Sequence, residues 1–289
     1  MILVRPDSGS HWYRPDGAPM HDMACANGAG TRPTSLRDAR KLGLYPSVTN
    51  VLSILAKPGL DAWKQEQAVL AALTLPRRSG ESEDEFARRV TSSLGGQGRD
   101  AADLGSAIHR GIERYAKTRE LPKNPDVARL FEPVRQWFDA EVTQVHGVEV
   151  AVAHPEWGYA GRVDLVATLQ SSGRPTVIDF KTQTTRRDRK GNFTPGFHEV
   201  WPLQLEAYRQ ALVSTDPKLS EAETASVVIG STEPVPVVVR VWDPLEAPAR
   251  FRAFLAARHL WVFTRRYCPV THSPESARTL STPPVTATS

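Results

Sequence analysis

The sequence predicts an α/β protein in which a central mixed β-sheet is flanked by helices and preceded by an N-terminal helical cap. Apolar residues recur at helical spacing between residues 47 and 142, and from residue 148 the pattern changes to the period of two that is typical of strands. Helical periodicity returns at 199–212 and 244–266, with two more strand-like stretches between these segments. Strands flanked by helices favour a layered sheet over a helical bundle.

Composition narrows the class of protein. The 289 residues are 40% hydrophobic and 24% charged, which is enough apolar material for a core. Cys25 and Cys268 are too far apart for a disulfide scaffold, a CxxC zinc site or a four-cysteine iron–sulfur cluster. The excess of basic residues, +4, favours polyanionic partners only mildly. We expect no membrane span and no secretory signal, because no apolar run is long enough and residues 1–12 lack a signal pattern.

Three segments are expected along the chain. Residues 1–95 should form turns and the helical cap, 96–270 the α/β core, and 271–289, rich in Ser, Thr and Pro, a disordered tail. Proline and glycine punctuate the first forty residues, so turns with at most short strands and a poor core are expected there. Helices are predicted at 47–56, 60–75, 81–94, 98–117 and 126–142.

The strands are predicted to begin with an antiparallel meander. Alternation over 148–153, 161–169 and 176–184 is interrupted by turn residues at 155–158 and 171–175. A basic loop at 186–198 follows, then the helix at 199–212 and strands at 225–230 and 235–242. The helix at 244–266 closes the fold.

The residues with the most chemical information lie on two neighbouring strands of this meander. Asp179 and Lys181 point to the same face of their strand. If the turn is centred between residues 171 and 172, Asp164 lies opposite Asp179, with the Cβ atoms about 5 Å apart. Facing carboxylates repel unless a cation lies between them, and Mg²⁺ suits oxygen ligands best. Lys181 beside that ion could orient or deprotonate water or neutralise a phosphate, which suits phosphodiester hydrolysis.

An isolated Asp-x-Lys on a strand is more often a surface ion pair, but here it stands in a series of four motifs. These are Gly105 to His109 (G-x-x-x-H), Gly161 to Asp164 (G-x-x-D), Asp179 to Thr182 (D-x-K-T) and Gln204 to Tyr208 (Q-x-x-x-Y). Each motif is weak alone, whereas the ordered set is specific. The chain thereby resembles the PD-(D/E)XK nuclease superfamily and, within it, the RecB-like exonuclease branch. The segments at 46–49 and 57–60 are similar to phage and prophage members.

The resemblance covers residues 98–212 and implies a restriction-endonuclease-like core. It implies Mg²⁺ or Mn²⁺ bound by His109, Asp164, Asp179 and the main-chain carbonyl of Phe180. Asp164, Asp179 and Lys181 would be catalytic, and Thr182, Gln204 and Tyr208 would lie at the substrate. Iron–sulfur members of the branch carry four cysteines around the core, which this chain lacks, so no cluster is expected.

Ordinary structural roles remain open for several of these residues. A lone helical histidine such as His109 is more often a surface or core residue. Glu113, one turn later, is expected to pair with Arg110 or Lys117 rather than to bind metal. The Q-x-x-x-Y pair lies on one helical face and could reach one ligand together or pack the helix on the sheet.

Positive charge and aromatic rings gather in the loop after the D-x-K-T motif. We expect Arg186, Arg187, Arg189 and Lys190 to contact substrate phosphates, with a solvated surface as the alternative. Phe193 and Phe197 are expected to stay partly exposed and are candidates to stack on bases. Further stacking candidates are Trp201 and the pairs Trp63–Lys64 and Trp157–Tyr159, although core packing is favoured for Trp63 and Trp137. A second basic cluster comprises Arg250, Arg252, Arg258, Arg265 and Arg266.

These observations predict a Mg²⁺- or Mn²⁺-dependent DNA exonuclease that hydrolyses phosphodiester bonds from DNA ends. A single-strand preference is expected, because a helical cap could narrow the passage to the metal. The nearest alternative is a structure-specific or restriction-type endonuclease of the same superfamily. A non-catalytic nucleic-acid-binding protein is the alternative from another class. The expected location is the cytoplasm of a bacterium or of a phage-infected host cell.

Overall fold

The computed structural model describes residues 11–25, 28, 30–56 and 58–270; within α3 and α4 no side chain is described at 58–61, 63–64 and 93–101. The expected tail at 271–289 lies outside the described residues, as do the side chains of Trp63 and Lys64. The helices are α1 (Leu36–Leu42), α2 (Val48–Leu52), α3 (Pro58–Thr74), α4 (Glu83–Thr118), α5 (Pro125–Glu141), α6 (Val200–Val213) and α7 (Ala247–Arg265), with 3-10 turns η1 (Pro217–Glu221) and η2 (Pro244–Glu246). The strands are β1 (Trp12–Tyr13), β2 (Asp22–Ala24), β3 (Thr31–Pro33), β4 (Tyr45–Pro46), β5 (Val142–His154), β6 (Tyr159–Leu169), β7 (Pro175–Gln183), β8 (Glu223–Gly230) and β9 (Val238–Val241).

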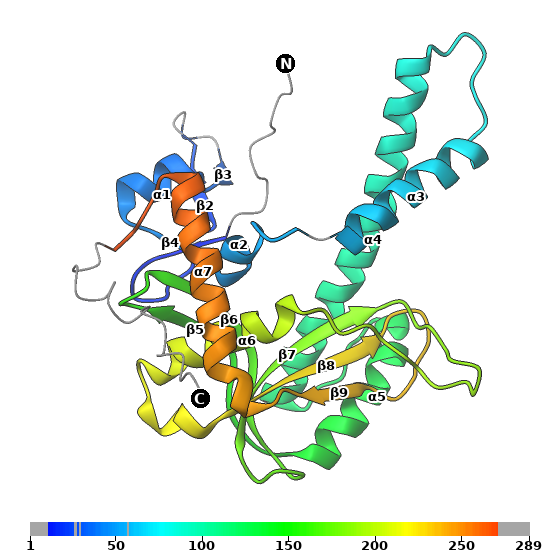
Figure 1. The fold of residues 1–289 in the computed structure, drawn as a ribbon. Coiled ribbons are helices and arrows are strands. Elements are labelled where there is room, and N and C mark those ends of the chain that lie inside the picture. Colours follow the sequence, from blue (N-terminus) through cyan, green and yellow to red (C-terminus); the bar gives the residue numbers. More distant parts are fainter. Residues whose placement is uncertain (1–10, 26–27, 29, 57, 271–289) are drawn as a thin grey trace, which may run out of the picture.

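The central sheet has five strands in the order β5-β6-β7-β8-β9 (Figure 1). The first three form the predicted antiparallel meander. β8 then joins β7 in parallel after the α6 crossover, and β9 pairs antiparallel at the edge. This mixed sheet with flanking helices and an N-terminal helical region confirms the predicted fold class and is consistent with a restriction-endonuclease-like core.

Apolar side chains form a core on each face of this sheet. One core lies under α2, α6 and α7 and includes Val51, Leu205 and Phe254. The other lies under α4 and α5 and includes Ile108 and Phe131. The alternation of the strands therefore feeds two helical layers, which explains why β6 and β7 are buried almost throughout. Among the described residues, no helix is both long and apolar enough to cross a membrane.

The first forty residues contribute more to the core than predicted. Trp12 and Ala39 are fully buried beside α7, and Tyr13 pairs across β1 and β4 with Tyr45. The helix α1 was not predicted, although a capping box at Ser35 and Asp38 marks its start. Its seven residues are too few to show a clear helical period, so the prediction of turns with at most short strands was wrong here.

The predicted helices at 81–94 and 98–117 are one continuous helix, α4. Gly95, Gly96 and Gly98 lie at the gap between the two predicted helices, and each glycine costs about 1 kcal/mol relative to alanine in a helix. A capping box at Ser82 and Glu85 and strong helix formers on both sides offset that cost.

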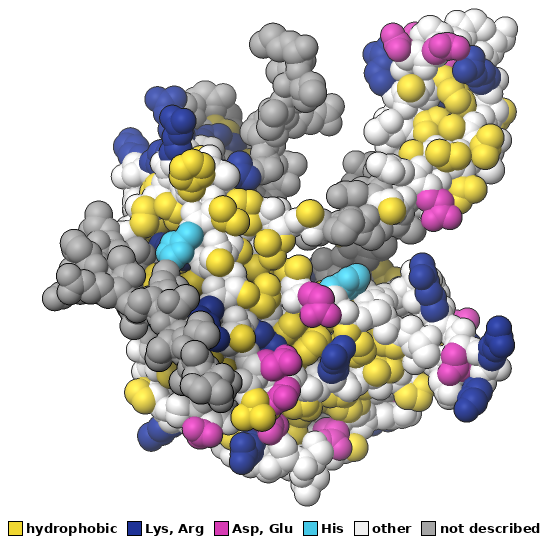
Figure 2. All heavy atoms as spheres, in the orientation of Figure 1, with side chains coloured by type: hydrophobic (Ala, Val, Ile, Leu, Met, Phe, Trp, Pro, Cys, Tyr) yellow, Lys and Arg dark blue, Asp and Glu magenta, His cyan; other side chains and the backbone are white. Residues whose placement is uncertain are grey.

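α3 and the first half of α4 form an arm that extends away from the sheet (Figure 1). Hydrophobic side chains gather along the arm (Figure 2), and Val69, Leu70 and Leu73 are exposed there. The second half of α4 instead packs on the sheet, where Ile108, Ile112 and Tyr115 are buried. One helix thus connects the arm to the site described next.

Candidate functional site

The G-x-x-x-H motif lies on the packed half of α4. Ile108 is buried against the sheet, and the neighbouring His109 is turned toward β6, with Nδ1 3.6 Å from Oδ2 of Asp164. Its ring meets that of Phe180 edge to face. Burial is the main cause of a lowered His109 pKa, which favours the neutral imidazole, the form that can bind a metal.

β6 and β7 pair in the register predicted from the hairpin turn. The ladder runs from Thr168 opposite Pro175 to Leu165 opposite Ile178. The next pair in this register is Asp164 and Asp179. The backbone ladder ends before this pair. Instead of a backbone carbonyl, Oδ2 of the Asp164 side chain accepts a hydrogen bond of 2.8 Å from the Phe180 N–H. The two carboxylates therefore lie where the two strands begin to separate.

Asp179 and Lys181 share one face of β7, as predicted. The Lys181 Nζ lies 2.7 Å from Asp179 Oδ2, and the Gln204 side chain donates to Asp179 Oδ1 at 3.0 Å. Lys181 also donates to Gln204 Oε1 at 3.4 Å, and Gln204 Nε2 lies 3.2 Å from the Tyr208 hydroxyl. The first turns of α6 thereby hold the catalytic candidates of β7 in place.

Two glycines of the motifs permit close approaches that a side chain would prevent. A Cβ on Gly161 would lie 2.5 Å from a ring carbon of Tyr208, and a Cβ on Gly105 would lie 3.0 Å from Oγ1 of Thr182. The G-x-x-D motif therefore packs on Q-x-x-x-Y, and G-x-x-x-H packs on D-x-K-T. The four motifs assemble into one unit through these contacts.

The site carries more negative than positive charge. Burial raises the pKa of Asp164 well above its usual range, and the neighbouring Asp179 charge raises it further. The Phe180 N–H and the Lys181 ammonium oppose this shift. One lysine thus faces two carboxylates in a low-dielectric setting, an arrangement that a divalent cation would stabilise.

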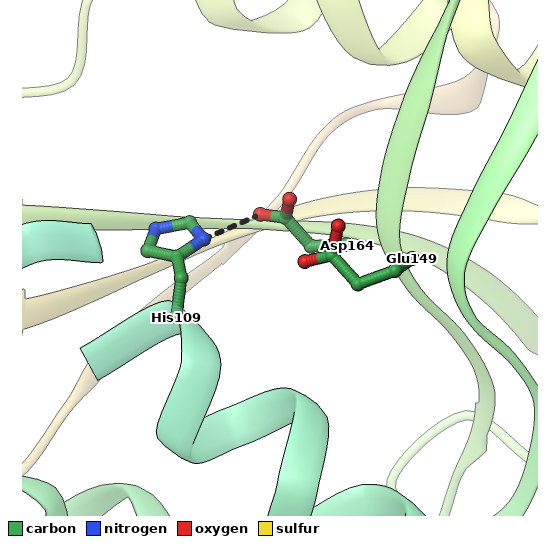
Figure 3. Close-up of side chains that lie close together, drawn as sticks. All are labelled: His109, Glu149 and Asp164. Atoms are coloured by element: carbon green, nitrogen blue, oxygen red, sulfur yellow. Dashed lines mark ion pairs between the residues drawn. The ribbon is translucent and has the colours of Figure 1, made fainter. Parts of the chain in front are cut away.

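Glu149 is a third carboxylate at this site and was missed by the sequence analysis. It lies on β5 at the level of Asp164, and ligand atoms of His109, Glu149 and Asp164 all lie within 4.8 Å of one another. The carboxyl groups of Glu149 and Asp164 lie side by side near the His109 ring (Figure 3). The Arg162 guanidinium forms an ion pair of 2.5 Å with the Glu149 carboxylate. One nitrogen and several hard oxygen donors fit Mg²⁺ or Mn²⁺.

An irregularity in both strands places Glu149. Val148 packs in the core under α4 and α5 while Val150 packs in the opposite core, although residues two apart on a regular strand share a face. On β6, Leu165 likewise packs in the core under α4 and α5, whereas Val163 packs in the opposite core. Glu149 itself has φ of 53°, in the left-handed region that non-glycine residues seldom adopt. The sequence over 148–153 alternates without interruption, so it carries no signal of this change of face that could have identified Glu149.

Other predicted residues have different surroundings. Glu113 pairs with Lys117 at 2.7 Å, which confirms the salt-bridge interpretation. In the basic loop, Arg187 pairs with Glu233 at 2.8 Å, whereas no carboxylate among the described residues pairs with Arg186, Arg189 or Lys190. The second basic cluster does not form one exposed surface, because Arg258 of α7 is buried.

The aromatic predictions were correct in part. Phe193 is buried against Val228 and Val235, so the expectation that the loop would leave it exposed was wrong. Tyr159 is fully buried, because its hydroxyl bonds to the Ala207 carbonyl under α6. Trp137 packs on Phe138 and Phe180 as expected. Phe197 and Trp201 remain half-buried and in contact with each other.

A comparison with curated proteins found no match. A comparison with protein families matched residues 128–258 to the PD-(D/E)XK nuclease superfamily. The matched segment contains Asp164, Asp179, Lys181 and the Q-x-x-x-Y helix, whereas His109 lies before it on α4. Over residues 128–258, the chain is therefore similar to the PD-(D/E)XK nuclease superfamily.

Proposed function

We propose that the protein is a Mg²⁺- or Mn²⁺-dependent deoxyribonuclease that hydrolyses DNA from free ends. The observation that carries this proposal is the convergence of Asp164, Asp179, Lys181 and His109 on one end of the β6–β7 ladder. A non-catalytic nucleic-acid-binding protein would not need this complete set. The resemblance to RecB-like exonucleases favours action at DNA ends over internal cleavage.

The proposed metal ligands are His109, Asp164, Asp179 and the Phe180 carbonyl, with Glu149 added from the geometry of the site. A divalent cation held there would supply an activated water and would offset charge on the attacked phosphate. The chain contributes the remaining steps. Lys181 donates to a phosphate oxygen or to the attacking water, and Gln204 fixes both Lys181 and Asp179. Tyr208 in turn contacts Gln204, so its own role is to position that amide.

The basic loop is proposed to hold the DNA outside the metal site. Arg186, Arg189 and Lys190 are exposed and free to contact phosphates away from the scissile bond. The domain division at residues 95 and 270 stays a prediction. In this arrangement β6, β7 and α6 perform the chemistry, while the loop at 186–198 contributes affinity.

End-labelled linear DNA and covalently closed circles test the proposal. Linear DNA should be degraded in Mg²⁺ or Mn²⁺ but not in EDTA, Ca²⁺ should allow binding without cleavage, and the circles should stay intact. Cleavage of closed circles would instead identify an endonuclease, and undiminished cleavage after exhaustive chelation would exclude the metal mechanism. Asp179→Asn is the inactive control.

The role of Glu149 is tested by metal binding rather than by activity. Glu149→Gln should weaken Mn²⁺ binding about tenfold in titration calorimetry, because a charged oxygen ligand is lost. Glu113→Gln is the matched control, since it removes an equal charge from a glutamate that pairs with Lys117. Equal Mn²⁺ affinity in the two variants would remove Glu149 from the ligand set.

A further inference from the structure

A series of cationic and aromatic side chains in contact leads from Lys181 to the edge of the sheet. Lys181 lies over the Trp201 ring at 5.8 Å, and Trp201 meets Phe197 at 5.8 Å. The Arg240 guanidinium lies over Phe197 at 5.3 Å and over Trp242 at 4.4 Å, and Arg250 lies over Trp242 at 5.5 Å. We call these six residues the cation–aromatic ladder.

The register of the sheet ties this ladder to the catalytic carboxylate. Asp179 on β7 is opposite Ser226 on β8, which is opposite Arg240 on β9. Residues opposite each other on neighbouring strands share a face, so Asp179 and Arg240 lie on the same face, two strand spacings or roughly 10 Å apart. A strand of nucleic acid bound at the metal site would reach Arg240 within a short length.

Arg240 differs from the other cations of the ladder in having no acidic partner. Lys181 pairs with Asp179 and Arg250 with Glu246, whereas no carboxylate among the described residues pairs with the exposed Arg240. Two aromatic rings hold its guanidinium plane, an interaction that leaves the N–H donors at its edge free. An ordered guanidinium with free donors is suited to a phosphate group.

The rings decide which form of nucleic acid fits. Phe197 and Trp201 are half-buried, so each presents part of its ring to solvent beside a cation. Bases stack on such rings only when they are unpaired, because a duplex hides their faces. Alternating stacking surfaces and phosphate contacts are the features by which proteins hold a single strand.

We propose that the cation–aromatic ladder binds one single strand of nucleic acid and guides it along the sheet toward Lys181. This proposal rests on the proposed nuclease function and adds the substrate form. The arm of α3 and α4 points away from the sheet, so the single-strand preference follows from the ladder rather than from a helical cap. Arg240 supplies a phosphate contact, and Phe197 with Trp201 supplies stacking surfaces.

Fluorescence anisotropy with labelled oligonucleotides in EDTA tests the proposal without cleavage. Arg240→Gln should weaken binding of a single strand about tenfold and make the log–log dependence of affinity on salt shallower by about 0.7. Phe197→Leu should weaken it several-fold with little change in that slope, because stacking carries no counterion release. DNA and RNA strands of one sequence identify the sugar preference, and either one losing affinity in both variants supports the ladder.

Arg174→Gln is the matched control, because this exposed arginine precedes β7 at the end of the sheet remote from Lys181. It should bind single strands like the wild type. Wild-type affinity in both ladder variants, or an equal loss for duplex and single strand, would overturn the proposal. Hydrolysis of bis(p-nitrophenyl) phosphate by the wild-type protein with Mn²⁺ tests the nuclease function separately, since this small diester is too short to span from the metal site to Arg240.

Discussion

One row of residues, opposite each other on successive strands, crosses the central sheet from β5 to β9. Its charge is negative on β5, β6 and β7, which we call the acidic side, and positive on β9, the basic side. On β5, β6 and β7 the row holds Glu149, Asp164 and Asp179, which are largely buried; Glu149 pairs with Arg162 and Asp179 with Lys181. On β9 it holds Arg240, which is exposed and without a carboxylate partner in the described part of the chain. The uncharged Ser226 of β8 separates them. In the proposed function the acidic side would hold a cation and the basic side an anion, so that a metal and a phosphodiester would be bound next to each other.

This contrast separates chemistry from binding, and Lys181 gives its strongest test. Lys181→Ala should lower turnover by about 10²- to 10⁴-fold at saturating DNA, with little change in DNA affinity, because its contact acts mainly in the transition state. Turnover and the dissociation constant should be measured separately on the same substrate. Lys117→Ala, which removes a lysine that pairs with Glu113, should retain wild-type turnover.

A wild-type rate for Lys181→Ala under saturation would return Asp179 and Lys181 to an ordinary ion pair. A large loss of DNA affinity with unchanged turnover would show that Lys181 contributes to DNA binding rather than to catalysis. Either result would remove the division between the two sides of the row.

The part of the site that could be predicted from the sequence depends on short-range patterns. Alternation, turn residues and motif spacing gave the β5–β7 meander and the register that brings Asp164 toward Asp179. Glu149 could not be found in this way, because a change of face in two strands breaks the alternation on which the prediction depends. Arg240 was missed for another reason: its significance comes from its contact with Phe197 in the basic loop, which leads on through Trp201 to Lys181, and these residues are far from Arg240 in the chain.

Packing also overrode local signals elsewhere. The gap predicted between helices at 81–94 and 98–117 is absent from the long helix α4. The proline- and glycine-rich start supplies Trp12 to the core, because burying an indole stabilises the fold more than local propensity opposes it. Phe193 is buried for the same reason, despite four basic neighbours in sequence. Local sequence patterns therefore predicted the strands of the sheet. The segments that pack around the sheet depend on long-range contacts, which those patterns do not contain.

Charge repulsion on the acidic side should be measurable as stability of the metal-free protein. Because the pKa of Asp164 is raised by burial and by Asp179, the unfolded chain ionises first as the pH rises, and stability falls between the unfolded and the folded pKa. Asp164→Asn removes this loss and should raise the free energy of unfolding by about 1–2 kcal/mol near neutral pH in EDTA. Urea titrations of wild type and variant would show the difference.

The same difference should disappear below about pH 3, where the wild-type carboxyl is largely protonated in both states. It should also shrink when Mg²⁺ binds to the wild type, since the cation offsets the repulsion. Glu156→Gln, an exposed carboxylate in the turn before β6, should change stability little at either pH. A variant less stable than wild type in EDTA would show that the acidic side is not under electrostatic strain.

The smallest expected effect belongs to the basic loop, which should act on affinity alone. Neutralising Arg186, Arg189 and Lys190 to Gln removes cations that lie after β7 and lack carboxylate partners among the described residues. Each lost contact to a single strand should make the log–log dependence of affinity on salt shallower by about 0.7, with near-normal cleavage at saturating DNA. Arg187→Gln is the internal control, because its pairing with Glu233 already neutralises it and its loss should change the slope least. A loss of turnover at saturating DNA in the loop variant would instead show that the loop acts in catalysis together with Lys181. The assignment of the basic loop to DNA binding alone would then be wrong.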